Sequence, residues 1–197
     1  MTVKDVIDGF REGAKENTER DAYANELFQE AVRIGMELNN QYHTPEELRE
    51  IMGRLTGKKI DDTFRLFPPF YTDFGKNITI GKDVFIISGF QFQDQGGIEI
   101  GDGTLIGHNV VLATINHDLS PKENRKNHYA PIKIGAHVWI NHTAGSYTWR
   151  LGSGCGRGCG GMGCSCHDGS RRCSCESAES GEGIAWGNSF RREGGTV

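Results

Sequence analysis

Cysteine is absent from residues 1–150, and all six cysteines fall within the last 47 residues. Long apolar runs are also absent, because no window approaches the roughly 18 apolar residues that a membrane helix needs. The first residues, MTVKDVIDGFREGAKENTERD, are too polar for a secretory signal. We therefore expect a cytosolic protein whose main part uses neither disulfides nor thiol chemistry.

Positive charge is not in excess either, since the formal net charge is −4. This balance gives no reason to expect nucleic acid or an anionic membrane surface as a partner. With 197 residues, the chain is long enough to bury one core and to carry an appendage.

Aliphatic side chains are scarce at the C-terminal end. The last 47 residues hold 13 of the 28 glycines but only three Leu, Ile or Val, which are Leu151, Ile184 and Val197. Composition changes near Ile140 and Asn141. We expect a helical cap and connector over 1–72, a repeat region over 73–140, and a Gly- and Cys-rich tail over 141–197.

Two helices are expected in the first part. Residues 18–39 place apolar side chains close to helical spacing, which indicates an amphipathic helix. Thr44, Pro45 and Glu47 then give an N-cap hydroxyl, a proline at the first helical position and a capping-box acid, and Gly57 supplies a C-terminal stop. The aromatic segment 64–71 reads as an apolar connector that covers the end of a core.

From Asn77 the sequence repeats, in the segments NITIGKDVFI, GIEIGDGTLIGHNVVL and PIKIGAHVWI. Aliphatic residues recur every six positions, a period that fits neither a helix nor simple strand alternation. It fits short strands joined by tight turns, with glycine where the backbone turns sharply. Three hexads make one coil of a parallel β-helix. Segment 113–131 breaks the period and is polar, so we expect a loop protruding from one corner.

Over roughly residues 18–140 the chain resembles the maltose/galactoside O-acetyltransferase group of hexapeptide-repeat acyltransferases. The resemblance rests on the helical N-terminus, FGKNITIGKDVF, FQDQGGIEIGDGTLIGHNVVLATINHDL and APIKIGAHVWI. It implies a mainly β fold, a left-handed parallel β-helix with an N-terminal helical cap. It also implies a homotrimer with active sites between subunits, and acetyl-CoA as co-substrate without a metal.

The resemblance places the catalytic base at His117, in the segment INHDL. An alcohol is a poor nucleophile at neutral pH, so an imidazole with an ordinary pKa near 6.5 would take its proton during attack on the thioester carbonyl. The protonated imidazole would then return this proton to the departing CoA thiolate. Without the resemblance, one loop histidine among seven would read as a surface residue.

Other positions are candidates for contact with the acceptor. Asp94, in the QDQ turn, would orient a sugar hydroxyl through a charge-assisted hydrogen bond, or else close a coil corner by bonding backbone. Asp73 occupies a position that contacts acceptor in relatives, or else it has a simple role in a turn. Trp139 would flank the active site, or be an aromatic at a coil corner.

Ile87 marks a departure from the family pattern. Relatives commonly carry Asn at this position, where it contacts the acceptor, so Ile87 is a further substrate-binding position; the sequence here reads FIIS. An amide that serves as an oxyanion donor contributes about 2.7–4 kcal/mol of transition-state stabilisation, so its loss bears on both rate and substrate.

The tail after Ile140 lacks the further coils of relatives, where CoA-contacting residues would lie, and two interpretations remain. One is a metal or disulfide module, because two CxC pairs lie near His167, at Cys164/Cys166 and Cys173/Cys175. Their spacings match none of the common CxxC zinc frameworks, however, and the cytosol keeps thiols reduced.

The other interpretation is a shifted reading frame. Thr148 to Leu151 can be encoded as ACC TGG CGT CTG, and a one-base shift gives CCT GGC GTC, which reads Pro-Gly-Val, as in the PGV turn of relatives. Gly154 to Gly163 would then decode mainly as Asp, Ala, Val, Glu or Gly. The segment from Ser180 to Trp186 can yield Pro-Gly-Lys-Val-Leu-Arg in the same frame.

The sequence therefore predicts an acetyl-CoA-dependent O-acetyltransferase acting on a sugar-like hydroxyl. Two competing hypotheses are a catalytically impaired trimer of the same fold, and a hexapeptide-repeat scaffold with a metal-binding tail.

Overall fold

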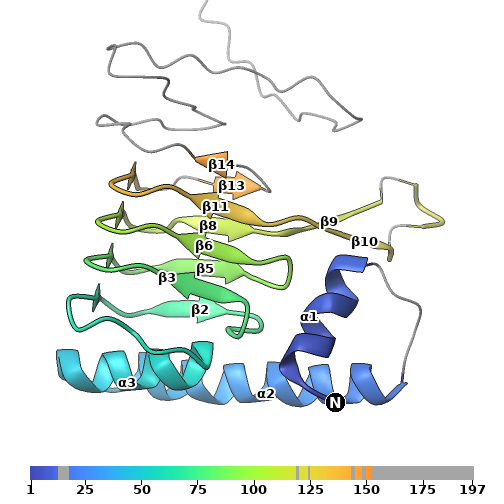
Figure 1. Cartoon of the computed structure of the whole chain (residues 1–197), viewed down its shortest axis with the longest axis horizontal. Coiled ribbons are helices and arrows are strands. Elements are labelled where there is room, and N and C mark those ends of the chain that lie inside the picture. The colour runs from blue at the N-terminus through green and yellow to red at the C-terminus, as the bar shows by residue number, and fades with distance from the viewer. Residues whose placement is uncertain (13–17, 119, 124, 143–144, 148–149, 152–197) are drawn as a thin grey trace, which may run out of the picture.

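The six-residue spacing of aliphatic side chains produces three parallel sheets that wrap into stacked coils (Figure 1). The computed structural model describes residues 1–12, 18–118, 120–123, 125–142, 145–147 and 150–151. Along the chain the strands visit the three sheets in turn and then repeat. Each circuit is one coil of a parallel β-helix, as the repeats predicted.

The three sheets, here named A, B and C, each contain four strands. Sheet A has the order β1 (Arg65–Leu66), β4 (Phe85–Ile86), β7 (Leu105–Ile106) and β12 (Trp139–Ile140). Sheet B has the order β2 (Phe70–Thr72), β5 (Phe90–Gln93), β8 (Val111–Ala113) and β13 (Gly145–Tyr147). Sheet C has the order β3 (Ile78–Ile80), β6 (Ile98–Ile100), β11 (Ile132–Ile134) and β14 (Arg150–Leu151).

Equivalent side chains stack from coil to coil inside the prism. Ile98 pairs in register with Ile78 on one side and Ile132 on the other, and all three are buried. Glycine is needed where successive coils come close, because a Cβ on Gly101 would lie 2.6 Å from the backbone nitrogen of Ala136. The aliphatic columns therefore form the core, and the corners hold the small residues.

Three helices cover one end of the stack and part of its side (Figure 1). They are α1 (Val3–Glu12), α2 (Thr18–Asn40) and α3 (Pro45–Thr56). The predicted capping box on α3 is confirmed: Thr44 Oγ1 accepts from the Glu47 N–H at 3.3 Å, and Glu47 Oε2 accepts from the Thr44 N–H at 2.8 Å. Gly57 ends the helix with a φ of 67°.

The sequence reading differs from the structure in three places. The aromatic connector at 64–71 supplies β1 and β2, so the first coil begins at Arg65 rather than after residue 72. Helix α1 was not predicted. Strands β13 and β14 continue sheets B and C beyond the boundary expected at Ile140. The six cysteines lie outside the described residues, so both interpretations of the tail stay predictions.

Candidate active site

The polar segment predicted as a loop forms an arm at the corner between sheets B and C. β9 (Ile115–His117) pairs antiparallel with β10 (Asn127–Tyr129), and this two-stranded hairpin projects from the coils (Figure 1). The hairpin itself was not predicted. Its polar sequence gave no strand signal, and its strands pair only with each other in the described part of the chain.

His117 lies at the end of β9, opposite Asn127. Its side chain is exposed, and within the described residues its imidazole makes no hydrogen bond or ion pair. The His117 backbone N–H donates to Asn116 Oδ1 at 2.9 Å. An exposed imidazole with free ring nitrogens can take a proton from a hydroxyl that comes within hydrogen-bond reach.

The neighbouring carboxylate, Asp118, does not orient His117. Its Oδ1 accepts the Ser120 backbone N–H at 2.9 Å, and its Oδ2 lies 3.6 Å from His128 Nε2. These partners, the Ser120 N–H foremost, lower the pKa of the Asp118 carboxyl below its ordinary value. Asp118 is therefore an anion that organises the arm.

Asp94 is fully buried at the corner between sheets B and C. Its Oδ1 accepts from Thr72 Oγ1 at 2.7 Å and from the Phe74 N–H at 3.0 Å, and its Oδ2 accepts from the Asn77 N–H at 3.3 Å. Burial raises the pKa of the Asp94 carboxyl, although these donors oppose that rise. Within this chain the geometry favours the alternative role of closing a corner, and direct contact of Asp94 with acceptor stays a prediction.

Gln95, the next residue, was not named as a site residue by sequence reasoning. Its side chain is 8% exposed, and its Nε2 donates to Asp73 Oδ2 at 3.3 Å. Oε1 of Gln95 is a buried side-chain oxygen with no hydrogen-bond partner among the described residues. Such an acceptor is costly unless a partner reaches it. The QDQ motif was the available signal, but adjacent polar residues do not disclose which one points inward.

Asp73 lies on the same corner, one coil below the pair Asp94 and Gln95. Its side chain is exposed, and its backbone N–H donates to the Phe92 carbonyl at 3.2 Å. One coil above, Thr114 Oγ1 accepts the Gly96 N–H at 2.8 Å, directly before the arm begins. The fold therefore stacks Asp73, Gln95 and the base of the His117 arm along one corner.

The other two predicted positions lie elsewhere. Ile87 follows β4 of sheet A, is half-buried, and donates its N–H to the Ile106 carbonyl at 3.0 Å. Trp139 lies within β12 and is 44% exposed on the outer face of sheet A, so its reading as a coil-corner aromatic is wrong. In a three-sided prism, sheet A lies opposite the corner between sheets B and C. One chain therefore does not bring Trp139 and His117 together.

Trp139 belongs to an exposed apolar column on sheet A. It pairs in register with Leu105, which pairs with Phe85, and the Phe67 ring packs edge-on against Phe85 at 5.2 Å. Leu105 and Phe67 are 43% and 58% exposed. These apolar side chains lie side by side on the outer face of sheet A.

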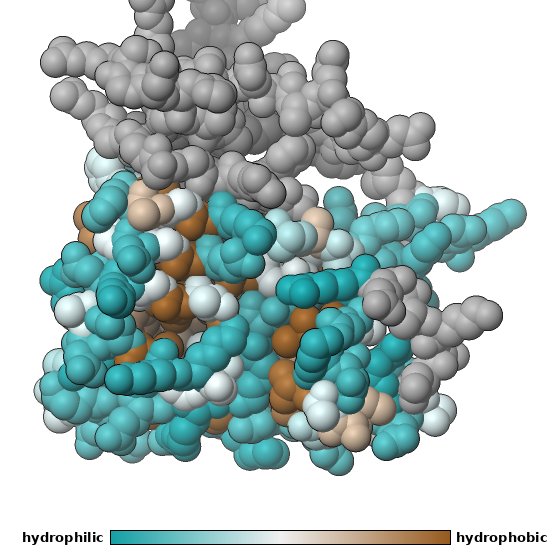
Figure 2. All heavy atoms as spheres, viewed as in Figure 1, coloured by the Kyte–Doolittle hydropathy of each residue, from teal (hydrophilic) through white to brown (hydrophobic). Residues whose placement is uncertain are grey.

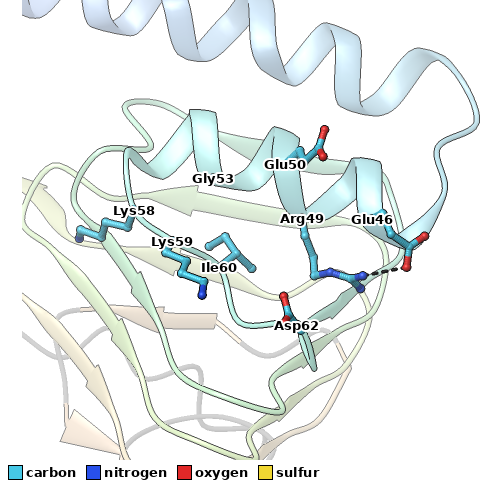
Figure 3. A pocket seen from close by; sticks show the side chains of 8 residues that line it. All are labelled: Glu46, Arg49, Glu50, Gly53, Lys58, Lys59, Ile60 and Asp62. Carbon is cyan, nitrogen blue, oxygen red and sulfur yellow. Dashed lines mark hydrogen bonds and ion pairs between the residues drawn. The ribbon is translucent and has the colours of Figure 1, made fainter.

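A hollow on the helical cap, between α3 and residues 58–62, is not a convincing alternative site (Figure 3). Its lining mixes three acids with three bases, and Arg49 is paired with Glu46 at 2.8 Å. Lys58 is directed to the Ile78 carbonyl at 2.7 Å. None of the predicted site residues lines it.

Two further observations apply only to the part of the chain that the structure describes. No helix there has the length and apolar character to cross a bilayer. No group of three or more His, Cys, Asp or Glu side chains there is arranged to hold a metal ion.

Comparisons with known proteins identify similar sequences and a similar fold. No protein-family model matches the chain. A sophorolipid acetyltransferase from Starmerella bombicola is 40% identical over 40% of this chain and 31% of its own length. A galactoside O-acetyltransferase from Escherichia coli K12 is 32% identical over 53% of this chain and 52% of its own. The chain thus spans about half the length, or less, of these curated relatives.

Among solved structures, a hexapeptide-repeat acetyltransferase from Vibrio cholerae superimposes with a TM-score of 0.62 at 28% identity, covering 66% of this chain and 74% of that one. The same protein complexed with acetyl-CoA matches with a TM-score of 0.54 at 26% identity, over 76% and 84% of the two chains. The predicted left-handed parallel β-helix is therefore confirmed, and the chain is similar in sequence to sugar O-acetyltransferases and in fold to hexapeptide-repeat acetyltransferases.

Proposed function

We propose that this protein transfers the acetyl group of acetyl-CoA to a hydroxyl of a sugar or sugar-like acceptor, with His117 as general base. The observation that carries the proposal is the imidazole of His117, which has no partner among the described residues and is exposed on an arm of the β-helix. Similarity to proteins named as galactoside and sophorolipid acetyltransferases supports the acceptor class. A relative solved with acetyl-CoA supports the donor.

The chemistry requires one proton to move twice. His117 takes the proton of the acceptor hydroxyl as its oxygen attacks the thioester carbonyl carbon. The tetrahedral intermediate then collapses, the carbon–sulfur bond breaks, and the proton returns from His117 to the CoA thiolate. The products are an acetyl ester and CoA, so neither a redox cofactor nor a metal is required. The cytosol is the proposed location.

The acceptor hydroxyls would be held by the polar corner below the arm. Asp73 offers an exposed carboxylate, and Gln95 Nε2 holds it by donating to Asp73 Oδ2 at 3.3 Å. A carboxylate accepts hydrogen bonds from sugar hydroxyls. Asp94 would act indirectly, because its hydrogen bonds hold the backbone of this corner in place.

We further propose a homotrimer with the active site between subunits. Trp139 and Leu105 lie on the face opposite the His117 corner, so Trp139 and His117 can approach one substrate only if they come from different copies. The exposed apolar column on sheet A gives such an assembly a surface to bury.

One observation favours a competing function. Ile87 has no polar side-chain atom where relatives carry an amide, so the chain could assemble and yet turn over slowly, as an impaired trimer.

Release of free thiol from acetyl-CoA, measured with a panel of sugars, tests the proposal. His117→Ala should lower kcat by about 10²–10⁴-fold. The matched control is His108→Ala, which removes another exposed imidazole from a coil corner and should leave kcat unchanged. An absence of turnover in the wild-type protein, or equal rates for it and His117→Ala, would refute the proposed enzyme.

A further inference from the structure

The arm that carries His117 has a narrow attachment to the coils. It leaves the stack after Thr114 and rejoins it at Ala130, whose N–H donates to the Thr114 carbonyl at 3.0 Å. In the described part of the chain β9 and β10 hydrogen-bond only to each other as strands. A two-stranded hairpin is marginally stable alone, so contacts to its side chains decide how firmly it is held.

Helix α1 supplies such a contact. It stands beside the coils with its C-terminal part close to β10, and apolar atoms reach the surface beside it (Figures 1 and 2). Its Val6 is fully buried in a small cluster with Ala24, Leu27 and Phe74, separate from the main core of the coils. This cluster fixes α1 to α2 and to the first coil.

Phe10 extends the cluster to the arm. Its ring packs edge-on against Phe74 at 5.6 Å and lies stacked on the Tyr129 ring at 5.3 Å with an interplanar angle of 29°. Aromatic pairs at these separations contribute beyond the area that they bury. Phe10 thereby connects an anchored helix with β10.

Tyr129 carries this connection toward the candidate base. Its hydroxyl accepts a hydrogen bond from Asn127 Nδ2 at 3.0 Å, and Asn127 is the cross-strand neighbour of His117. Directly opposed residues share a face of an antiparallel pair, as do residues two apart on a strand. Tyr129, Asn127 and His117 therefore lie on the same face of the hairpin.

We propose that Phe10 and Tyr129 are positioning residues that hold the arm so that the His117 imidazole meets the acceptor hydroxyl. The proposal rests on the proposed function in naming the group that is positioned. Neither ring is assigned a contact with substrate. A displacement of about 1 Å in a reacting group can cost about 10²-fold in rate. Loss of the contact between the two rings should therefore lower kcat measurably.

The test combines a readout that needs no activity with one that does. Amide hydrogen exchange of residues 115–117 and 127–129 reports how firmly the arm is held. In Phe10→Ala this exchange should quicken by about 10-fold or more, while exchange in β3, β6 and β11 stays unchanged. The kcat should fall by 10-fold or more, the KM for acetyl-CoA should stay within about 2-fold, and the pH profile should keep its shape because the base is retained.

Three variants separate positioning from general destabilisation. Phe10→Tyr keeps a ring at the contact and should restore both exchange and kcat. Tyr129→Leu removes the partner ring on the arm without altering the packing of α1 on α2. It should show the same faster arm exchange and lower kcat, and it replaces Phe10→Ala as the test if that variant fails to fold. Leu48→Ala deletes buried volume in α3, remote from the arm, and should lower stability without changing kcat or arm exchange.

Unchanged arm exchange in both Phe10→Ala and Tyr129→Leu would overturn the proposed positioning role of the two rings. So would a loss of kcat no greater than in Leu48→Ala. If the wild-type protein proves inactive, the proposed enzyme fails, but the exchange measurement still decides whether Phe10 holds the arm.

Discussion

The carboxylate of Asp94 accepts a hydrogen bond from the backbone N–H of Phe74 at 3.0 Å, which joins the second coil to the first. The same carboxylate accepts the N–H of Asn77, so one buried side chain serves several backbone donors of the coil below. Phe74 in turn belongs to the cluster that anchors α1. A single buried acid therefore connects the coil corner with the packing of the N-terminal helix.

The raised pKa of the Asp94 carboxyl predicts a pH-dependent stability. Because burial places the folded-state pKa above the unfolded value of about 3.9, the folded chain binds more protons between these two values. The free energy of unfolding contributed by Asp94 should therefore fall as pH rises through that window and be constant above it.

Asp94→Asn provides the comparison, measured as urea unfolding from pH 4 to pH 8. The difference between wild type and variant should carry the slope, since lowered carboxyl pKa values such as that of Asp118 give both proteins the opposite trend. The variant should also show a pH-independent loss of about 1 kcal/mol, because an amide nitrogen cannot accept the Asn77 N–H. Parallel curves for the two proteins would contradict the prediction.

Gln95→Leu should weaken acceptor binding without weakening the fold. The variant removes the amide that holds the Asp73 carboxylate. The KM for the acceptor should therefore rise roughly 2-fold to 10-fold, which corresponds to one hydrogen bond of about 0.5–1.5 kcal/mol, with the KM for acetyl-CoA unchanged. Stability should hold or increase, because the variant removes a buried oxygen that has no partner in the described chain. Gln91→Leu, on the exposed face of β5, is the matched control. Equal KM values for the two variants would remove Gln95 from the acceptor site.

Leu105→Glu should dissociate the proposed trimer. The substitution puts a charge in the middle of the exposed apolar column, and burying an unpaired charge costs several kcal/mol. Sedimentation velocity should show monomer in place of trimer at micromolar concentration. Thr79→Glu, on the outer face of β3, introduces the same charge on another sheet and should leave the assembly intact. A trimeric Leu105→Glu protein would mean that sheet A faces solvent.

Thr44→Ala should destabilise the helical cap by about 1 kcal/mol, because the Glu47 N–H loses its acceptor and the capping box is broken. Thr44→Ser keeps the hydroxyl and should behave as wild type. The midpoint of urea unfolding should fall at constant m value. An unchanged midpoint would show that α3 is held by its packing alone.

The coils could be predicted because their signal is redundant. Ile78, Ile98 and Ile132 repeat one role in successive coils, so the period survives even though each strand is only a few residues long. The capping box on α3 is also local, since all its groups lie within a few residues. Structure that follows from such local or repeated patterns can be predicted without knowledge of distant contacts.

The parts that were missed depend on contacts between distant residues. Helix α1 has ten residues, and its position depends on rings such as Phe28 and Phe74 far along the chain. Asp94 and Gln95 are adjacent, polar and both buried, and their hydrogen-bond partners in the coil below decide the role of each. That His117 and Trp139 lie on opposite sides of the prism follows from the order of the three sheets, which no single motif encodes.

The arm that carries His117 interrupts the coils without changing their register. Ile98 pairs with Ile132 in the same way that Ile78 pairs with Ile98, although the arm intervenes only in the first case. The rise of each coil is therefore independent of how many residues lie outside it. An arm of another length or sequence can replace this one without shifting the register of the strands. The segment that carries His117 can therefore change while the coils that support it stay the same.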